Sequence, residues 1–414
     1  MASSSRRNVL TLITGTALAQ GISIAITPII TRIYTPESFG VFALYVSIVS
    51  LISVIATGRY ELAIMLPQKK SDAIHLVLLS FFITCVISVI CFVVIFLFGD
   101  LIIIYLGNST IEKWLYCIPV SIMLSGFVQS LRCWNNRCEE YKAIAISRFS
   151  NSAGMSAVNL SLPSFSLSKY GLVSGYIVGQ SLSVISVSRK FNFYTLKSCE
   201  LKTVYSLAKK YKTFPMVNSI HAFVNVFKLN VVNIILIKNF TETVLGQYFM
   251  VLQIMQAPSA LIGASIAQVF YRDASVEYKK GNNIQHLVKQ MILKLVIFSS
   301  LPACLMFFFS EPLFVLVFGP SWSEMGGYAH ALLPYIYLHF IVSPLGMVPL
   351  IIGAQVKAFY WGVLESGIFI CVFVVGGIIH NNITDTLQLL SFVFMIYFSI
   401  YIYWIIYLSG NKNV

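Results

Sequence analysis

Long apolar stretches alternate with short polar connections along the whole chain. A helix needs about 20 mostly apolar residues to cross a bilayer, so each stretch predicts one membrane span. The predicted fold class is therefore an all-α polytopic membrane protein of about twelve transmembrane helices. The predicted spans are 9–31, 39–58, 73–98, 113–131, 144–163, 171–188, 214–237, 244–269, 287–309, 328–352, 359–379 and 386–408.

The composition excludes a water-soluble fold. Hydrophobic residues make up 57% of the chain, charged residues 10%, and the mean hydropathy is +0.82. A soluble fold of 414 residues cannot bury that much apolar surface. We therefore expect only short extramembrane loops, apart from the connection 189–213.

The positive charges predict the orientation. Of the 28 Lys and Arg residues, 23 fall in alternate connections between the spans, and Lys/Arg-rich short loops stay cytoplasmic. Both termini and the connection 189–213 are therefore predicted to be cytoplasmic. The net charge of +13 then reflects topology and attraction to anionic membrane lipids. Nucleic-acid binding is not expected, because it requires a basic groove with base-contacting groups.

The two halves of the chain resemble each other, which predicts a duplication. Six spans per half give both halves the same orientation, and parallel repeats of this kind form transporters with a site near the bilayer midplane. We expect an N-terminal lobe at 1–188, a basic cytoplasmic linker at 189–213 and a C-terminal lobe at 214–414. The matching segments are 34–42 with 240–248, 99–107 with 311–319, and 141–143 with 356–358.

Polar residues inside two spans predict the site. Their spacing of three and four residues places each set on one helical face, although such stripes also join membrane helices by hydrogen bonds. Lys228 lies about fourteen residues into its span, where a charge costs about 2.5–3.5 kcal/mol, so it should face a partner or a wet cavity. Snorkelling to the headgroups is the alternative. The stripes are Thr16, Gln20, Ser23 and Thr27 in span one, and Asn218, His221, Asn225 and Lys228 in span seven.

Five further charged residues lie in or next to spans. Glu365 is about six residues into span eleven. It is either an ion-coupling group or a side chain that reaches the lipid headgroups. Arg59 and Glu61 follow span two, either at a cavity mouth or as a local ion pair. Arg272 and Asp273 occupy the equivalent place after span eight, which favours the cavity mouth.

Enzyme chemistry is not predicted. The chain has no phosphate loop, no HExxH motif and no nucleophile elbow, so we expect no ATP hydrolysis. The eight Cys are scattered without zinc-ligand spacing, so neither a metal nor a cofactor is expected. A proton or sodium gradient is the expected energy source, with Glu365, Glu61 and His221 as candidate titrating groups. Passive equilibration drawn by polymerisation outside is the alternative.

Three segments carry a family resemblance. They are 8–11, 31–45 and 59–67, the second of which reads TRIYTPESFGVFALY. These segments resemble the opening of the bacterial polysaccharide-synthesis flippases, the O-antigen and oligosaccharide-unit translocases of the multidrug/oligosaccharidyl-lipid/polysaccharide exporter superfamily. The resemblance implies two six-helix lobes around a central cavity in the bacterial inner membrane. It also implies export of undecaprenyl-diphosphate-linked oligosaccharide units to the periplasmic leaflet, with a polysaccharide polymerase and a chain-length regulator as further expected partners.

On this interpretation Lys228 and Arg59 meet the diphosphate, and neutral polar residues of the two stripes meet the sugar hydroxyls. Drug or cation exporters and peptidoglycan-precursor flippases of the superfamily are close alternatives. The exporters often carry a carboxylate in the first helix of a lobe, which spans one and seven lack, and the peptidoglycan flippases have fourteen spans. A membrane glycosyltransferase or polymerase is a third alternative. The neutral residues are Thr16, Gln20, Thr27, Asn218, His221 and Asn225.

Overall fold

The computed structural model describes residues 2–108, 110–165, 171–198, 200–258, 262–281, 283–379 and 382–410, and within these ranges it is helical with no strand. The predicted all-α class is confirmed. The chain forms two compact units, Met1–Lys238 and Asn239–Val414. Helix α10 belongs to the first unit by its contacts, so this division falls one helix later than the predicted linker 189–213. The predicted lobes stay a prediction.

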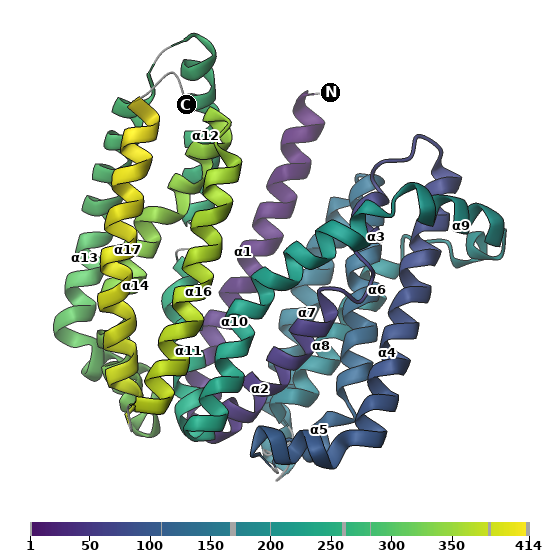
Figure 1. The fold of residues 1–414 in the computed structure, drawn as a ribbon. Coiled ribbons are helices and arrows are strands. Elements are labelled where there is room, and N and C mark those ends of the chain that lie inside the picture. The colour runs from purple at the N-terminus through teal and green to yellow at the C-terminus, as the bar shows by residue number, and fades with distance from the viewer. Residues whose placement is uncertain are drawn as a thin grey trace. The chain divides into compact units, whose positions relative to one another are not determined.

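The second helix of the first unit has a capped N-terminus. Thr35 caps this helix, since its hydroxyl accepts a hydrogen bond from the Ser38 amide at 3.4 Å, and Pro36 occupies the first turn. The helices of the unit are α1 (Ala2–Ile33), α2 (Pro36–Ser53), α3 (Tyr60–Ala63), α4 (Lys70–Leu106), α5 (Glu112–Leu115), α6 (Ile118–Arg137), α7 (Tyr141–Ser161), α8 (Gly171–Ser188), α9 (Leu201–Lys210) and α10 (Ser219–Asn239) (Figure 1).

Small residues bring the helices of this unit close together. A Cβ atom on Gly179 of α8 would lie 2.6 Å from the Asn151 carbonyl oxygen of α7, and one on Gly15 of α1 would lie 2.4 Å from Ala145 of α7. Close approach through small residues is how membrane helices gain packing energy, because lipid offers no hydrophobic driving force between them. The tight contacts of α7 with α1 and α8 hold the walls of the site described below.

The second unit is held by aromatic packing. The ring of Tyr335 on α14 meets Phe394 of α17 edge-on at 5.0 Å, and Tyr248 of α11 meets Phe373 of α16 at 5.6 Å. The helices are α11 (Glu242–Pro258), α12 (Ala264–Lys279), α13 (Gln285–Phe318), α14 (Glu324–Val342), α15 (Val348–Ile352), α16 (Gln355–Ile379) and α17 (Ile383–Gly410).

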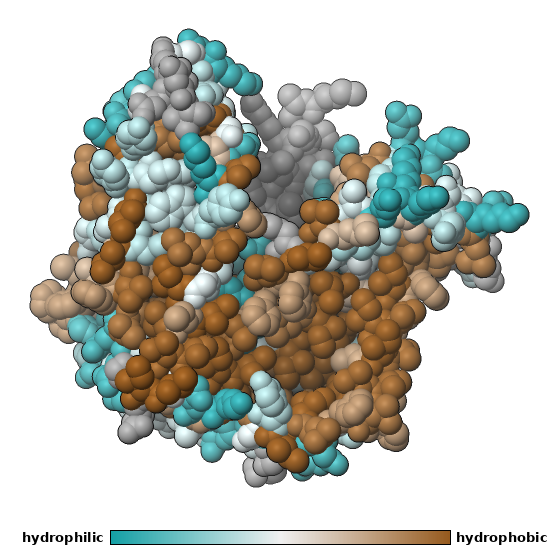
Figure 2. Space-filling model, viewed as in Figure 1, coloured by the Kyte–Doolittle hydropathy of each residue, from teal (hydrophilic) through white to brown (hydrophobic). Residues whose placement is uncertain are grey.

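Ten helical stretches of the described chain are long and apolar enough to cross a membrane. In each unit, apolar residues cover the middle of the helices and polar residues gather at their ends (Figure 2). Two of the twelve predicted spans fall outside these ten. The segment 144–163 is helical as α7 but too polar to qualify, and 244–269 is covered by the separate helices α11 and α12. The polar character of α7 has a structural reason, which the cavity beside it shows.

Candidate functional site

A polar cavity of about 550 Å³ lies in the first unit between α1, α6, α7 and α8. Two arginines contribute its charge, and no acidic residue is among its described lining residues. This volume lies within the usual range of small-molecule sites. The lining residues are Thr16, Ala19, Gln20, Ser23, Ser125, Val128, Gln129, Arg132, Arg148, Asn151, Ser152, Tyr176 and Gln180.

Arg132 of α6 is held by hydroxyl groups rather than by carboxylates. Its Nη2 donates to Ser183 at 3.1 Å and to Ser147 at 3.3 Å, and the two serine oxygens are themselves 2.6 Å apart. The Nε of Arg132 is buried without a hydrogen-bond partner among the described residues. Arg132 therefore keeps one buried donor that the described residues leave unpaired.

Arg148 of α7 reaches across the cavity to the first helix, where its Nη1 donates to the Thr16 hydroxyl. Gln20 follows Thr16 by four residues on α1 and also lines the cavity. Two cations in a partly buried site repel each other and lose hydration, which is costly unless an anion joins them. The arrangement therefore favours an anionic ligand.

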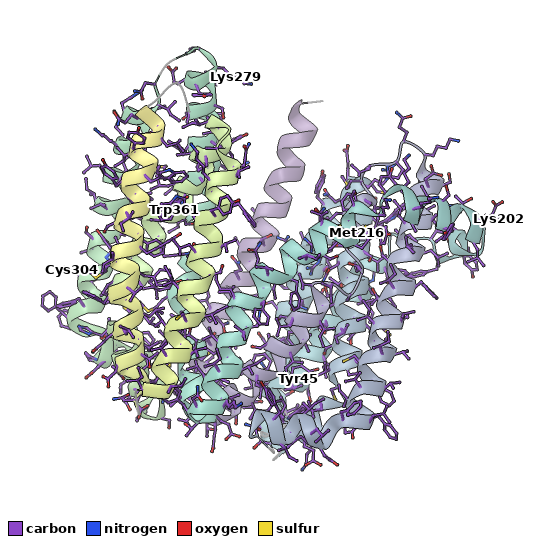
Figure 3. All side chains as sticks on the ribbon, viewed as in Figure 1. Tyr45, Lys202, Met216, Lys279, Cys304 and Trp361 are labelled. Carbon is purple, nitrogen blue, oxygen red and sulfur yellow. The ribbon has the colours of Figure 1, made fainter. Side chains whose placement is uncertain are left out.

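Neutral groups complete the wall. Gln180 donates to the Ser125 hydroxyl at 2.8 Å, and Ser152 donates to the Ala19 carbonyl at 2.7 Å. Tyr176 presents a ring, and Tyr45 of α2, labelled in Figure 3, packs edge-on against that ring at 6.1 Å. Amides, hydroxyls and one aromatic ring can hydrogen-bond and stack against a sugar.

The structure places three residues of the predicted span-one stripe on this cavity, Thr16, Gln20 and Ser23. Thr27 lies further along α1, where its hydroxyl donates to the Ser23 carbonyl at 2.6 Å. Sequence reasoning missed Arg132 and Arg148, because it counted both among the cytoplasmic loop charges. The sequence did contain a signal for Arg148. It lies in the predicted span 144–163 among small polar residues, which make this span unusually polar for a membrane helix.

The span-seven stripe does not line a described cavity. Asn218 ends a π-helical turn, Phe214–Asn218, and is exposed, as is Asn225 on α10. Lys228 is half-buried on the same helix. The side chain of His221 lies outside the described residues. The substrate-binding role of this stripe stays a prediction.

Arg59 and Glu61 form the local ion pair that was one of the two expectations for them. The Nη1 atom of Arg59 lies 3.5 Å from the Oε1 atom of Glu61, and the Glu61 side chain is only 3% exposed. The Thr57 hydroxyl donates to the same carboxylate. Burial raises the pKa of Glu61, and the hydrogen bond from Thr57 and the charge of Arg59 oppose this increase. Neither residue lines the polar cavity.

A second, smaller cavity of about 190 Å³ lies in the second unit and contains Glu365. Aromatic side chains surround it, including Trp361 of α16, labelled in Figure 3, whose carbonyl accepts a hydrogen bond from Tyr397 at 2.8 Å. His339 of α14 also contributes to the wall, with its ring 6.0 Å from that of Phe398. One carboxylate among aromatic faces suits a small cation.

Known structures share this fold. An inward-facing multidrug resistance MATE family transporter of the MOP superfamily aligns with a TM-score of 0.61, 11% identity and 95% coverage of both chains. A MATE protein in complex with MaD5 aligns with a TM-score of 0.51 and 10% identity, covering 96% of this chain and 94% of the other. The chain is therefore a multi-pass membrane protein with the two-lobed MATE-like transporter fold.

The sequence itself identifies the family. Residues 29–326 match the family described as "Polysaccharide biosynthesis protein". This match covers more than half of the chain, so the protein belongs to that family. No curated protein matches the sequence.

Proposed function

We propose that the protein is a flippase for undecaprenyl-diphosphate-linked oligosaccharide units of a surface polysaccharide, such as an O-antigen. It would move them from the cytoplasmic to the periplasmic leaflet of the bacterial inner membrane by alternating access. The observation that carries this proposal is the polar cavity of the first unit, in which Arg132 and Arg148 stand among neutral groups without an acid.

The chemistry of the cavity fits such a head group. A diphosphate loses hydration when it leaves water, and two guanidinium groups offset this loss through charge-assisted, bidentate hydrogen bonds. The amides of Gln20, Gln129 and Asn151 can bond sugar hydroxyls, and the face of Tyr176 can pack against a sugar ring. Flipping requires no covalent step, so no catalytic group is needed.

The alternatives fit the cavity less well. A cationic drug would meet two positive charges and no carboxylate there, although the shared MATE fold keeps an exporter as the second candidate. A glycosyltransferase or polymerase needs a catalytic acid or base at the bound sugar. Such a group is absent from the described lining of this cavity.

We further propose that a cation gradient drives the cycle through Glu365. A carboxylate in a small aromatic cavity can take up either a proton or a sodium ion, and the two states differ in local charge. A change of charge at one site that favours one conformation of the transporter couples the gradient to transport.

The proposal is tested by deleting the gene and recovering the lipid-linked saccharides. We expect an undecaprenyl-diphosphate saccharide to accumulate and surface polysaccharide to be lost. Wild-type protein should restore surface polysaccharide and remove the accumulated saccharide. The Lys142→Gln variant, which loses one exposed charge on α7, should do the same, whereas Arg132→Gln should do neither. Normal surface polysaccharide in the deletion strain would exclude the proposed substrate.

A further inference from the structure

Helix α13 of the second unit carries two adjoining cavities along one face. The first, about 550 Å³, lies between α12 and α13, and the second, about 320 Å³, lies between α11, α13 and α14. Phe298 lines both, so the two cavities meet at its ring, and together they are called here the α13 groove. The α13 residues that line it are Leu287, Gln290, Met291, Lys294, Leu295, Phe298, Ser299, Pro302, Ala303 and Met306.

The groove has the chemistry of a lipid site. Its floor is apolar and buried, with Phe270, Met291 and Leu295 at most 8% exposed. Its side walls remain accessible, since Val269 and Phe298 are each 55% exposed. The Ser299 hydroxyl donates to the Leu295 carbonyl at 2.7 Å, so it does not need a polar ligand.

Charged and amide side chains are found in the described lining of the first cavity and not in that of the second. They are Asp273 of α12 and Gln290 and Lys294 of α13. Asp273 is already paired with Arg272, at 2.9 Å, whereas the exposed Lys294 forms no described ion pair. Long helical side chains point back toward the helix N-terminus, so the ammonium group of Lys294 lies on the polar side. Figure 3 shows Lys279 at this end of α12 and Cys304 further along α13.

The length of the groove distinguishes between possible occupants. From Lys294 to Met306 the groove-lining stripe of α13 is about 18 Å long at 1.5 Å per residue. The hydrocarbon layer is about 30 Å thick, so the acyl chain of a phospholipid covers only about 15 Å before the midplane. A ligand that fills the whole stripe therefore needs a chain longer than one leaflet.

We infer that the α13 groove binds the polyprenyl chain of a lipid phosphate, with the phosphate next to Lys294. The inference rests on the proposed function, and it assigns the lipid tail a fixed path along α13 instead of leaving it among the bulk lipids. Lys294 supplies the charge that an anionic head needs. Ser299 and Ala303 are small, which leaves room for a methyl-branched chain between α13 and α14.

Photolabelling tests this assignment in the full-length protein. Undecaprenyl phosphate with a diazirine in its chain is irradiated with the protein in vesicles of phosphatidylethanolamine and phosphatidylglycerol, and labelled peptides are mapped by mass spectrometry. We expect label on α13 and α14 that unlabelled undecaprenyl phosphate removes and excess phosphatidylglycerol does not. Ala303→Trp, which fills the groove, should lower it more than fivefold, and Lys294→Gln should lower it severalfold.

Matched controls lie on the same helix. Leu301→Trp adds the same ring at a position that does not line the groove, and Lys289→Gln removes the same charge outside it. Both should label like wild type. If Ala303→Trp does not reach the membrane, Ser299→Leu fills the same groove.

Four results would overturn the inference. Labelling that phosphatidylglycerol competes away equally well would mean an ordinary annular lipid. Labelling that the groove-filling variants leave unchanged would mean another path for the chain. Specific labelling confined to the first unit would exclude the groove and leave the proposed flippase intact, whereas no specific labelling anywhere would count against both.

Discussion

The two polar cavities described above differ in the sign of the charge that they present. The cavity of the first unit contains Arg132 and Arg148 and measures about 550 Å³. The cavity of the second unit contains Glu365 among aromatic rings and measures about 190 Å³. Among the described lining residues, the first cavity has no carboxylate and the second has no lysine or arginine.

Under the proposed function, the first unit would bind the anionic substrate and the second unit would bind the coupling cation. A diphosphate and a coupling cation would neutralise each other in one shared site, and the coupling ion could then not act independently of the substrate. Under this proposal, cavities of opposite charge in the two units bind the anionic substrate and the cation separately, and a conformational change links the two. The predictions below test each side of this division.

The largest effect is expected at the arginines. Arg132→Gln/Arg148→Gln should reduce flipping of a lipid-linked oligosaccharide in proteoliposomes at least a hundredfold, because both charge-assisted contacts to the diphosphate are lost. Arg148→Lys should keep partial activity, since a lysine retains the charge but not the fork.

Lys142→Gln is the control, because Lys142 lies on the same helix with its side chain exposed. A double arginine variant that inserts normally and flips at the wild-type rate would show that this cavity does not bind the substrate.

A tenfold or larger loss of surface polysaccharide is expected on substitution of Lys228, the residue that the sequence predicts to bind the diphosphate. Lys228→Ala should reduce surface polysaccharide without changing the amount of protein in the membrane, whereas Lys228→Arg should retain substantial activity. A purely structural lysine predicts the reverse, because removing a charge from a span lowers the insertion cost. Wild-type export by a folded Lys228→Met protein would therefore rule out a role in diphosphate binding.

The fold followed from the sequence more readily than the site did. Apolar runs of about 20 residues and the distribution of Lys and Arg predicted a polytopic helical protein, since the bilayer permits few other structures. The stripe that begins with Thr16 and Gln20 also led to the polar cavity, because helical spacing alone places these residues on one face.

The arginines show why the rest of the site was not predictable. Arg132, Arg137 and Arg148 lie in one basic cluster and count equally as topology charges. In the structure Arg137 donates to the Ile64 and Pro67 carbonyls at 3.0 and 2.6 Å, whereas the other two line the cavity. Tertiary packing decides which arginine bonds loop carbonyls and which lines a cavity. The spacing of the arginines along the chain does not reveal this difference.

A severalfold effect is expected at Glu365. The Glu365→Gln side chain cannot release a proton or attract a sodium ion. Flipping should therefore lose its response to an imposed gradient, whereas substrate binding should stay at the wild-type level. Transport and substrate binding are measured on the same proteoliposomes, with Asp385→Asn as an exposed control. Gradient-dependent flipping by the Gln variant would exclude Glu365 as the coupling group.

A smaller effect on stability compares the packing of the two units. Gly179→Ala places a Cβ 2.6 Å from the Asn151 backbone oxygen, which cannot move without displacing α7 and the cavity wall. Gly376→Ala meets Thr386 at 2.4 Å from its Cγ2 and 2.9 Å from its Cβ, so rotation of that side chain relieves the closest contact and leaves a smaller one. We expect Gly179→Ala to cost about 1–3 kcal/mol, Gly376→Ala less, and Gly21→Ala, which has nothing within 4 Å, close to nothing. Thermal unfolding in detergent measures the order, and equal losses at Gly179 and Gly376 would contradict it.

The smallest effect concerns pH and the buried carboxylate of Glu61, which lies outside both polar cavities. Burial raises the pKa of Glu61 above its ordinary value of 4.5, so in the window between these two values the folded protein binds a proton that the unfolded chain releases. Stability therefore falls as the pH rises through this window, and it is recovered on acidification. The midpoint of thermal unfolding should rise for wild type relative to Glu61→Gln when the pH is lowered from about 7 to about 5. Glu37→Gln controls for the loss of one carboxylate, because Glu37 is exposed at the start of α2. A difference of the opposite sign would mean that Arg59 and Thr57 stabilise the charged form more strongly than burial opposes it.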